Sequence, residues 1–572
     1  MTSPTTEQKG QPTISDTVDR RWLKFYDAAV PPHLDYPRIP LYQLLDDSAA
    51  QRPNQVCARF FGRPFTYRQM KEATDRLAAG LRGLGVRPGD RVGVLLPNCP
   101  QFIVAYYGIL KAGAVVLPLN PLYTDYELTH HFSDSGAETV ITIPLFLPKV
   151  DLLRGKTGLK RVIVTRLADA LPFPLNLAQG VQEMRLARGA KVPDLIPFQK
   201  LTDAKPPADY RPEPVDPDSL AVLIYSGGTT GVGKGIMLSH YACVANVRQI
   251  IAWGQLQDND KLLAVLPLFH GFGMSVTMNG TIGAGGEMIL LPRFKARDVV
   301  KAIQKFKPTF FLGVPTMFVA FSNLPDIAKY DLSSLRGIFV GAAPLTRAIK
   351  ESFEAKTGAR MIEGYGLTEA VTAIMANPFH GQHKLGSIGL PFPDVDMKIV
   401  GLDDGHDLPP GELGEIVLRS PTLMTGYFKK PDETAQTISN GWLLTGDIGY
   451  MDEEGYFFIT DRKKELIIVG GFNVFPREID ELIYQHPKVK EGICVGLPDP
   501  YKGEKIKVYL TLKDGETATP EEFIAYFRER LTPYKAPSEV EFRDELPKSM
   551  IGKILRRQLR EEELAKTQGK RA

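Results

Sequence analysis

The 572-residue chain contains little cysteine, and its few cysteines are not spaced as a cluster. The four, Cys57, Cys99, Cys243 and Cys494, lie far apart, and no CxxC pair occurs. Neither a disulfide framework nor a zinc site is therefore expected, and a reducing compartment fits this usage. An excess of one charge is also lacking, because 69 basic and 66 acidic residues leave a net charge of only +3. Such a balance produces no strong positive electrostatic field of the kind that would indicate a nucleic acid as partner.

Long hydrophobic runs are missing as well. The longest, from Phe102 to Leu119, is interrupted by Lys111 and Gly113, which indicates a helix followed by a buried strand and not a membrane span. The polar segment 1–19 lacks the apolar centre of a secretory signal. We expect a soluble, cytoplasmic protein. No fixed-period repeat occurs, which argues against a solenoid.

The length exceeds what one hydrophobic core supports, so at least two domains are expected. Short apolar runs alternate with amphipathic stretches, as in βαβ units whose parallel sheets carry helices on both faces. The predicted strands are 91–97, 114–119, 337–340 and 360–363, and the predicted helices are 100–111 and 345–356. Ligands of such a fold bind in loops at the carboxyl ends of the strands.

Two segments have the composition of joints. Residues 171–214 are rich in Pro and Lys/Arg and include a mildly amphipathic, basic stretch at 175–188. A solvated surface insertion is the favoured interpretation of that stretch, with a membrane-surface patch as the alternative. The second joint is DRKK, at 461–464, and from about Arg462 the pattern becomes that of a small α+β domain of roughly 110 residues.

Within this small domain we predict three elements. A helix begins at Pro476 and extends to Tyr484, because proline suits the first helical position. Residues 505–512 alternate, with Ile506, Val508, Leu510 and Leu512 on one face, which predicts a half-buried strand. Thr519 and Glu522 form a capping box for a helix over 520–531.

The most informative segment is YSGGTTGVGKGIMLSH, at 225–240, which follows the apolar strand 220–224. Glycines let a backbone approach a ligand closely, and N–H groups, hydroxyls and one ammonium together suit a polyphosphate. The residues that would form this cradle are Ser226, Gly227, Gly228, Thr229, Thr230, Gly231, Gly233 and Lys234. A Walker A loop is the rival interpretation, but Gly235 stands where that motif needs the Ser or Thr that binds Mg²⁺.

Other segments offer matching chemistry. EGYGLTE, at 363–369, supplies an aromatic ring that can stack on a base (Tyr365), a hydroxyl (Thr368) and a carboxylate suited to Mg²⁺ (Glu369). GAAP, at 341–344, is small enough for a flat ring or an acyl chain to lie against its backbone. Asp447 could accept hydrogen bonds from two vicinal hydroxyls, with Arg462 as an added donor.

The C-terminal segment PKSMIGKILRR contains Lys553 in a short glycine-led loop, where an ammonium could offset charge that builds on a phosphate. The neighbouring Lys548, Arg556 and Arg557 are expected to be merely solvated. His270, in LPLFHGFGM, could be a general base, a metal ligand or a structural histidine. No GxSxG elbow and no Cys–His pair points to a covalent nucleophile.

Taken in order, these motifs resemble those of the adenylate-forming superfamily over nearly the whole chain, from about Leu41 to Arg560. Many members have proline where this chain has Gly233, a departure seen among long-chain fatty acyl-CoA synthetases. NPLY at 120–123 and DSG at 134–136 are most similar to medium- and long-chain members. The resemblance implies a large N-terminal domain (1–461) of doubly wound α/β subdomains with a small β-barrel-like part, and a mobile α+β C-terminal domain (462–572).

The resemblance also implies roles for individual residues. Tyr365 would lie over adenine, Thr368 would contact the α-phosphate and Glu369 would bind the metal, together with Thr229. Lys553 would be the adenylation lysine, Lys464 the hinge, and His270 a gate between acyl pocket and thiol tunnel. The remaining implied contacts are Gly341, Ala342, Ala343, Gly364 and Gly366 on adenine and acyl group, Asp447 and Arg462 on ribose, and Gly470, Gly471 and Phe472 beside the thiol.

The implied reaction joins a fatty acid to CoA through an acyl-adenylate, with ATP, Mg²⁺ and CoA as cofactors. Coumarate-type ligases carry a lysine where this chain has Ile468, which disfavours aryl acids, although a coumarate-like ligase stays a rival hypothesis. A ligase that loads an acyl carrier protein and a catalytically inactive scaffold are two further hypotheses. Peripheral contact with the inner face of a membrane and a homodimer are left open.

Overall fold

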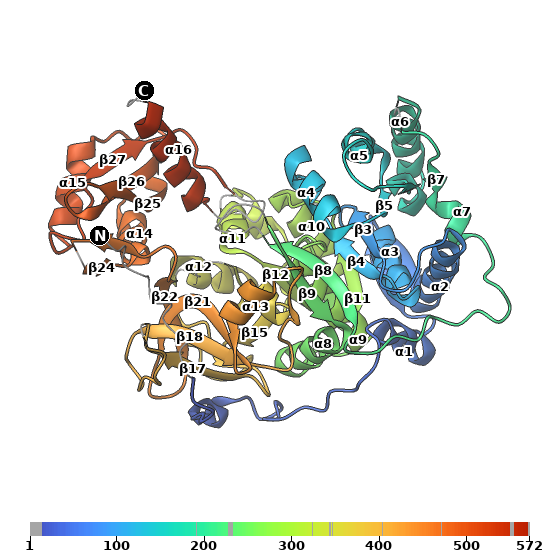
Figure 1. Cartoon of the computed structure of the whole chain (residues 1–572), viewed down its shortest axis with the longest axis horizontal. Coiled ribbons are helices and arrows are strands. Elements are labelled where there is room, and N and C mark those ends of the chain that lie inside the picture. The colour runs from blue at the N-terminus through green and yellow to red at the C-terminus, as the bar shows by residue number, and fades with distance from the viewer. Residues whose placement is uncertain are drawn as a thin grey trace, which may run out of the picture. The chain divides into compact units, whose positions relative to one another are not determined.

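The computed structural model describes residues 14–189, 192–226, 233–322, 324–342, 345, 347–402, 404–470, 472–548 and 554–569 (Figure 1). The chain forms two compact units. The large unit comprises Arg20–Asp396 and Arg419–Leu443, and the small unit comprises Met1–Asp19, Met397–Leu418 and Leu444–Ala572. The small unit thus includes 397–418 and 444–461 besides the C-terminal residues, and the boundary at 461/462 stays a prediction.

An eight-stranded sheet of the large unit carries the first predicted βαβ elements. Its order is β19 (Gly426–Tyr427), β9 (Lys234–Ser239), β8 (Leu220–Ser226), β4 (Val115–Pro118), β3 (Arg91–Leu95), β5 (Thr139–Thr142), β6 (Arg161–Val164) and β7 (Ile196–Pro197). From β8 to β7 all neighbours are parallel, whereas β9 pairs antiparallel with both β8 and β19. The predicted helix over 100–111 is confirmed as α3 (Pro100–Lys111), and all of its residues are buried.

A nine-stranded sheet forms the other half of the large unit. Its order is β16 (Leu390–Pro391), β15 (Ala373–Ala376), β14 (Arg360–Gly366), β13 (Gly337–Val340), β12 (Phe310–Gly313), β10 (Lys261–Ala264), β11 (Glu287–Leu290), β1 (Val56–Phe60) and β2 (Arg63–Thr66). The strands from β14 to β1 are parallel, and β15, β16 and β2 extend the edges antiparallel. Two largely parallel sheets connected by helices confirm the α/β prediction.

A third sheet has five strands, and the small β-barrel-like part that the resemblance implies stays a prediction. Its order is β17 (Asp396–Val400), β18 (Gly414–Arg419), β21 (Trp442–Met451) and β20 (Ile438–Ser439), and β22 (Phe457–Arg462) also pairs with β21. In the antiparallel β21–β22 pair, Asp447 lies opposite Arg462. These two residues, which lie on consecutive strands, are therefore direct neighbours across the sheet.

The fourth sheet is the centre of the C-terminal α+β region. Its order is β24 (Phe472–Val474), β23 (Ile467–Val469), β26 (Gly503–Leu512) and β25 (Val489–Asp499), and β27 (Glu539–Phe542) pairs with β26. The helices are α14 (Pro476–Gln485), α15 (Pro520–Arg528) and α16 (Arg556–Gly569). The Thr519 side chain accepts a hydrogen bond from the Glu522 amide as expected, although α15 ends at Arg528 and not at Leu531.

The prediction that 505–512 is half-buried is wrong. β26 is buried on both faces from Ile506 to Thr511, since Ile506, Val508 and Leu510 join one core and Tyr509 joins another. The second core contains Leu559 of α16, so that helix belongs to the face that the alternation assigned to solvent.

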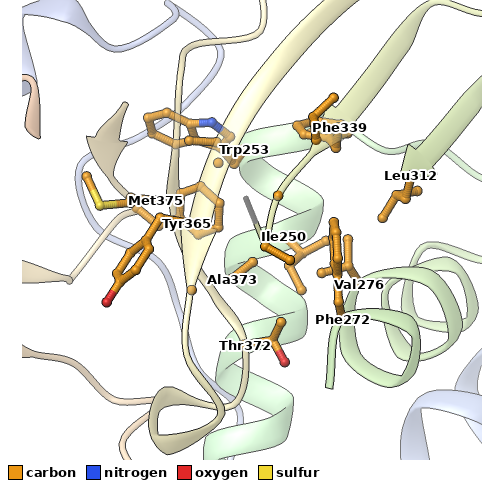
Figure 2. A pocket seen from close by; sticks show the side chains of 18 of the residues that line it. Ile250, Trp253, Phe272, Val276, Leu312, Phe339, Tyr365, Thr372, Ala373 and Met375 are labelled. Atoms are coloured by element: carbon orange, nitrogen blue, oxygen red, sulfur yellow. The ribbon is translucent and has the colours of Figure 1, made fainter. Parts of the chain in front are cut away.

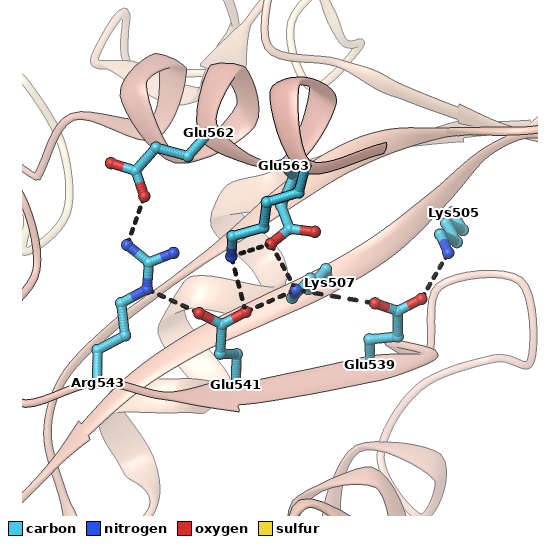
Figure 3. Close-up of polar contacts among 8 residues, drawn as sticks. Lys505, Lys507, Glu539, Glu541, Arg543, Glu562 and Glu563 are labelled. Atoms are coloured by element: carbon cyan, nitrogen blue, oxygen red, sulfur yellow. Dashed lines mark hydrogen bonds and ion pairs between the residues drawn. The ribbon is translucent and has the colours of Figure 1, made fainter. Parts of the chain in front are cut away.

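Charged residues on this second face explain the misleading alternation (Figure 3). The side chain of Lys507 is only 9% exposed, and its ammonium lies 2.7 Å from Glu541 Oε2 and 3.0 Å from Glu563 Oε1 of α16. Arg543 bridges Glu541 and Glu562 at 2.9 and 2.6 Å. Lysines at two alternate positions, 505 and 507, are typical of a solvated face, yet the charge of Lys507 is buried beside two carboxylates.

Arg556 contradicts the expectation that it is merely solvated. Its Nη2 lies 2.7 Å from Asp480 Oδ2, its Nε lies 3.2 Å from Glu465 Oε2, and its Nη1 donates to the Cys494 carbonyl at 2.7 Å. The guanidinium therefore joins α14, β25 and the segment before β23. By contrast, Arg557 is 39% exposed and pairs with Glu561 on its own helix.

The sequence makes predictions about both the cysteines and the longest apolar run. The four cysteines are buried and none forms a disulfide, as their spacing predicts. Among the described residues, no helix combines the length and apolarity needed to span a bilayer.

Arg556→Ala should destabilise the small unit by about 3–5 kcal/mol, because it removes one partner of an ion pair whose side chains are only 15% and 18% exposed and leaves the Asp480 charge uncompensated. Hydrogen exchange at the amides of α14 and β25 would measure the loss. Arg557→Ala is the matched control and should change stability by less than about 0.5 kcal/mol. Equal effects of the two substitutions would contradict a structural role for Arg556.

Candidate active site

The predicted phosphate cradle begins where β8 ends and finishes where β9 starts. In the β8–β9 pair Ser226 lies opposite Lys234, so both ends of the cradle are held by one hairpin. The side chain of Ser226 lies outside the described residues, as do Gly227, Gly228, Thr229, Thr230 and Gly231. Lys234 is described, and only 20% of its side chain is exposed.

Lys234 and Glu369 share one neighbour, Tyr427 of β19. The Lys234 ammonium lies 4.8 Å from the centroid of the Tyr427 ring, and the Tyr427 hydroxyl donates a hydrogen bond of 3.0 Å to Glu369 Oε1. Burial, and then the Glu369 charge, raise the pKa of Tyr427, so its hydroxyl keeps its proton. The structure thus brings together two residues that the motifs assigned to phosphate and metal.

Lys234 also forms an ion pair with Glu433 of α13 (Pro431–Thr437). Sequence reasoning missed both Glu433 and Tyr427. No local signal marks them, because Tyr427 reaches Lys234 only through the pairing of β19 with β9.

Glu369 is suited to magnesium by its fixed geometry. Its carbonyl accepts the Met424 amide at 2.7 Å, and its carboxylate accepts Tyr427, so both backbone and side chain are held by the segment around β19. Within the described ranges no cluster of three or more His, Cys, Asp or Glu could hold a metal by itself. Magnesium requires only one or two protein carboxylates when phosphates and waters complete its shell, so a single glutamate fits it.

The large unit also contains an apolar pocket (Figure 2). It encloses about 810 Å³ of empty space, its open mouth included. Six residues that the sequence singled out line it: His270, Gly341, Ala342, Gly364, Tyr365 and Gly366. The pocket therefore unites three separate motifs. Ala343 lies outside the described residues.

The remaining wall is almost wholly hydrophobic. Figure 2 labels Ile250 and Trp253 from α8 (His240–Gly254), Phe272 and Val276 from η4 (Phe272–Asn279), Leu312, Phe339 and Met375 among the lining side chains. Trp253 is fixed by a hydrogen bond from its indole nitrogen to the Asn377 carbonyl at 3.2 Å and packs tilted against Phe392, with centroids 4.9 Å apart. Such a wall suits a hydrocarbon chain or a flat ring.

Glycines in β14 let β15 approach the pocket wall. A Cβ at Gly366 would lie 1.5 Å from the Thr372 carbonyl oxygen, and one at Gly364 would lie 3.0 Å from that of Met375. Any side chain at Gly366 would separate the two strands. The lack of side chains at Gly364 and Gly366 therefore lets Tyr365, the residue between these two glycines, lie opposite Met375 of β15.

His270 lies at the pocket as an uncharged imidazole. Its Nδ1 accepts a hydrogen bond from the Phe272 amide at 3.2 Å, and burial lowers the pKa of its ring. An Nδ1 that accepts leaves the ring proton on Nε2, so Nδ1 is not free to act as a base. This geometry favours a wall or gate over proton transfer.

The small unit carries the residues predicted for the ribose, the hinge and the thiol side. Arg462 Nε lies 2.9 Å from Asp447 Oδ1, so the two predicted ribose ligands are adjacent, and the side chain of Asp447 is buried. Lys464 is exposed. The Gly470 backbone has φ +59°, which favours glycine, and Phe472 stacks on Tyr534 with centroids 4.8 Å apart. Gly471 and Lys553 lie outside the described residues.

Asp461 has a structural role that the motif analysis did not assign. Its carboxylate accepts the Arg462 amide at 2.7 Å and the Arg477 amide at 2.8 Å, which ties the end of β22 to the start of α14. Burial raises the pKa of Asp461 to about 6. Asp461, the first residue of the polar DRKK segment, therefore faces the protein interior.

Comparison with known proteins gives two family matches. Residues 45–428 match the model of the AMP-binding enzyme, and residues 478–553 match that of the AMP-binding enzyme C-terminal domain. A long-chain-fatty-acid–CoA ligase of Bacillus subtilis is 41% identical over 547 residues, which cover 95% of this chain and 98% of that protein. One of Escherichia coli O6:H1 is 40% identical over 564 residues, which cover 96% and 99%. The crystal structure of the anthranilate CoA ligase AuaEII in complex with anthranoyl-AMP superposes with a TM-score of 0.81 at 28% identity, covering 92% of this chain and 98% of that one.

Proposed function

The chain belongs to the AMP-binding enzyme family, and from this premise we propose that it is a long-chain-fatty-acid–CoA ligase that works through an acyl-adenylate. The observation that carries the proposal is the apolar pocket, whose wall includes His270, Gly341 and Tyr365 from three distant motifs. Relatives with this activity in their names are about 40% identical over nearly the full chain.

The reaction has two steps at one carbonyl group. A carboxylate oxygen attacks the α-phosphorus of ATP, and the bond from that phosphorus to the pyrophosphate oxygen breaks. The sulfur of CoA then attacks the acyl carbon, the bond to the AMP oxygen breaks, and the thiol proton is lost. These steps demand positioning and charge stabilisation more than a protein nucleophile.

In the large unit, we assign the nucleotide base to Tyr365 and the wall of Gly341, Ala342 and Ala343. Thr368 contacts the α-phosphate, and Lys234 with the 226–231 segment holds the remaining phosphates. Glu369 and Thr229 would hold Mg²⁺, which offsets phosphate charge when bound. The contact of Glu369 with Tyr427 supports this assignment, since it orients the carboxylate in advance.

In the small unit, Asp447 and Arg462 bind the ribose hydroxyls, and Lys553 offsets charge on the α-phosphate during adenylation. The thiol must later reach the same carbonyl group. We therefore assign Lys464 as the hinge of a domain rotation and Gly470–Phe472 as the segment beside the thiol.

Two rival functions differ in substrate. A coumarate-like ligase would place an aromatic acid in the same pocket, and a carrier-loading ligase would use a protein-bound thiol. The pocket wall suits either kind of acid, but Ile468, where coumarate-type ligases carry a lysine, and the relatives named as long-chain-fatty-acid–CoA ligases favour an alkyl acid.

A screen of acids tests the proposal. Pyrophosphate release with ATP, Mg²⁺ and CoA should be greatest for medium- and long-chain fatty acids, because each buried methylene adds about 0.8 kcal/mol of transfer free energy. Mass spectrometry should identify acyl-CoA as the product. Greatest turnover on cinnamates, or a product formed only on a carrier protein, would refute the assignment.

Lys553→Ala should lower the rate of acyl-AMP formation by about 100- to 1000-fold, because a positive charge at the α-phosphate is lost. Transfer from added acyl-AMP to CoA should stay close to the wild-type rate. Lys548→Ala is the control, since Lys548 pairs with Glu491 at 2.5 Å and is given no catalytic role. A wild-type adenylation rate in Lys553→Ala would remove that residue from the mechanism.

We also propose that helix α6 (Leu175–Gly189) contacts anionic membranes. Its exposed residues include Leu177, Val181 and Met184. The helix's acidic residue is turned away, because Glu183 is buried and its carboxylate accepts the amides of Leu167 and Ala168. Exposed apolar side chains next to a basic residue, Arg185, suit the interface of an anionic membrane.

Sedimentation with anionic vesicles at low salt tests this contact. The Leu177→Glu/Val181→Glu variant should bind less than wild type, because two apolar anchors become anionic. Gln182→Glu, an exposed position on the same helix, adds one charge and should have a smaller effect. Wild-type protein that remains in the supernatant would exclude membrane contact through α6.

A further inference from the structure

Glu433 is held at the phosphate cradle by strand pairing. In the β19–β9 pair Gly426 lies opposite Met237 and Tyr427 opposite Ile236, and the Phe428 amide donates to the Gly235 carbonyl at 2.7 Å. Helix α13 follows within a few residues, which places Glu433 next to the first residue of β9. An acidic residue almost 200 positions away thus faces the cradle's lysine.

The Glu433 carboxylate binds two ammonium groups. One oxygen pairs with Lys234, and the other lies 2.5 Å from Lys430 Nζ. Lys234 first, and then Lys430, hold the pKa of Glu433 below its usual range, so the group is a carboxylate at neutral pH. Its oxygens present to Lys234 the same kind of anionic acceptor that a phosphate would.

The pairing is specific to Glu433, although a second carboxylate is close. Tyr427 contacts both Lys234, through its ring, and Glu369, through its hydroxyl. In the part of the chain that the structure describes, no ion pair joins Lys234 to Glu369. Among the described residues, Lys234 thus pairs with Glu433, whereas the Glu369 carboxylate accepts the Tyr427 hydroxyl.

We propose that Glu433 competes with the polyphosphate for the Lys234 ammonium, so that the polyphosphate must displace a carboxylate in order to bind. This inference rests on the proposed function, in which Lys234 contacts the phosphates. The side chains of Lys234 and Glu433 are 20% and 32% exposed, so the pair is neither fully solvated nor buried. Measured energies of such pairs correspond to a change of about two- to five-fold in affinity.

Equilibrium binding to the full-length protein tests this competition, with ATP and adenosine as the two probes. Glu433→Gln should lower the Kd for ATP about two- to five-fold, because Lys234 no longer has a competing anion. The Kd for adenosine, which has no phosphate, should not change. Asp432→Asn is the matched control, since it removes the same charge from an exposed position one residue away on α13.

A second background separates the direct pair from a general change in charge. In Lys234→Met protein, adding Glu433→Gln should leave the Kd for ATP unchanged. An unchanged or raised ATP Kd in Glu433→Gln alone, an equal decrease in Asp432→Asn, or a decrease that persists without Lys234 would overturn the inference. Wild-type protein that fails to bind ATP at all would instead reject the proposed function.

Discussion

The central constraint of the candidate site is that β9 pairs antiparallel with two strands at once. Its partner β8 ends at the predicted phosphate cradle, and its partner β19 carries Tyr427. This double pairing, with helix α13 that follows β19, brings a lysine, a phenol and two carboxylates from three distant parts of the sequence into contact with one another. Polyphosphate chemistry needs such a set, because negative charge must be offset by groups whose positions are fixed before the ligand arrives.

Local patterns predicted several helices and strands and six of the residues that line the pocket. The apolar run at 100–111 begins with a proline that suits a first helical turn, and α3 has those bounds. Gly341 and Ala342 of GAAP line the same pocket as Gly364 of EGYGLTE, because the two motifs lie at the ends of neighbouring parallel strands, β13 and β14. Where a motif carries its own chemistry and the strand order is regular, sequence alone places the residue.

The failures share a physical cause, which is contact between segments far apart in sequence. The alternation in β26 gave no indication that α16 covers its second face, where Glu563 neutralises Lys507. Arg556 lies in a segment whose composition is typical of a solvated basic tail, yet its guanidinium pairs with Asp480 and Glu465. Glu433 and Tyr427 lie in an unremarkable polar stretch and acquire meaning only through β19. The periodicity of a strand or helix indicates which of its residues could be exposed. It does not indicate which distant segments of the chain pack over them.

In the proposed competition, the pairing of Glu433 with Lys234 affects the release of pyrophosphate as well as the binding of ATP. An internal anion that competes with a bound polyphosphate weakens the hold on ATP and on pyrophosphate through the same ammonium. The weaker binding of ATP would be offset by easier release of pyrophosphate, because the Glu433 carboxylate can pair with Lys234 again as pyrophosphate leaves. A modest affinity for nucleotide would then be a condition of rapid turnover and not a defect of the cradle.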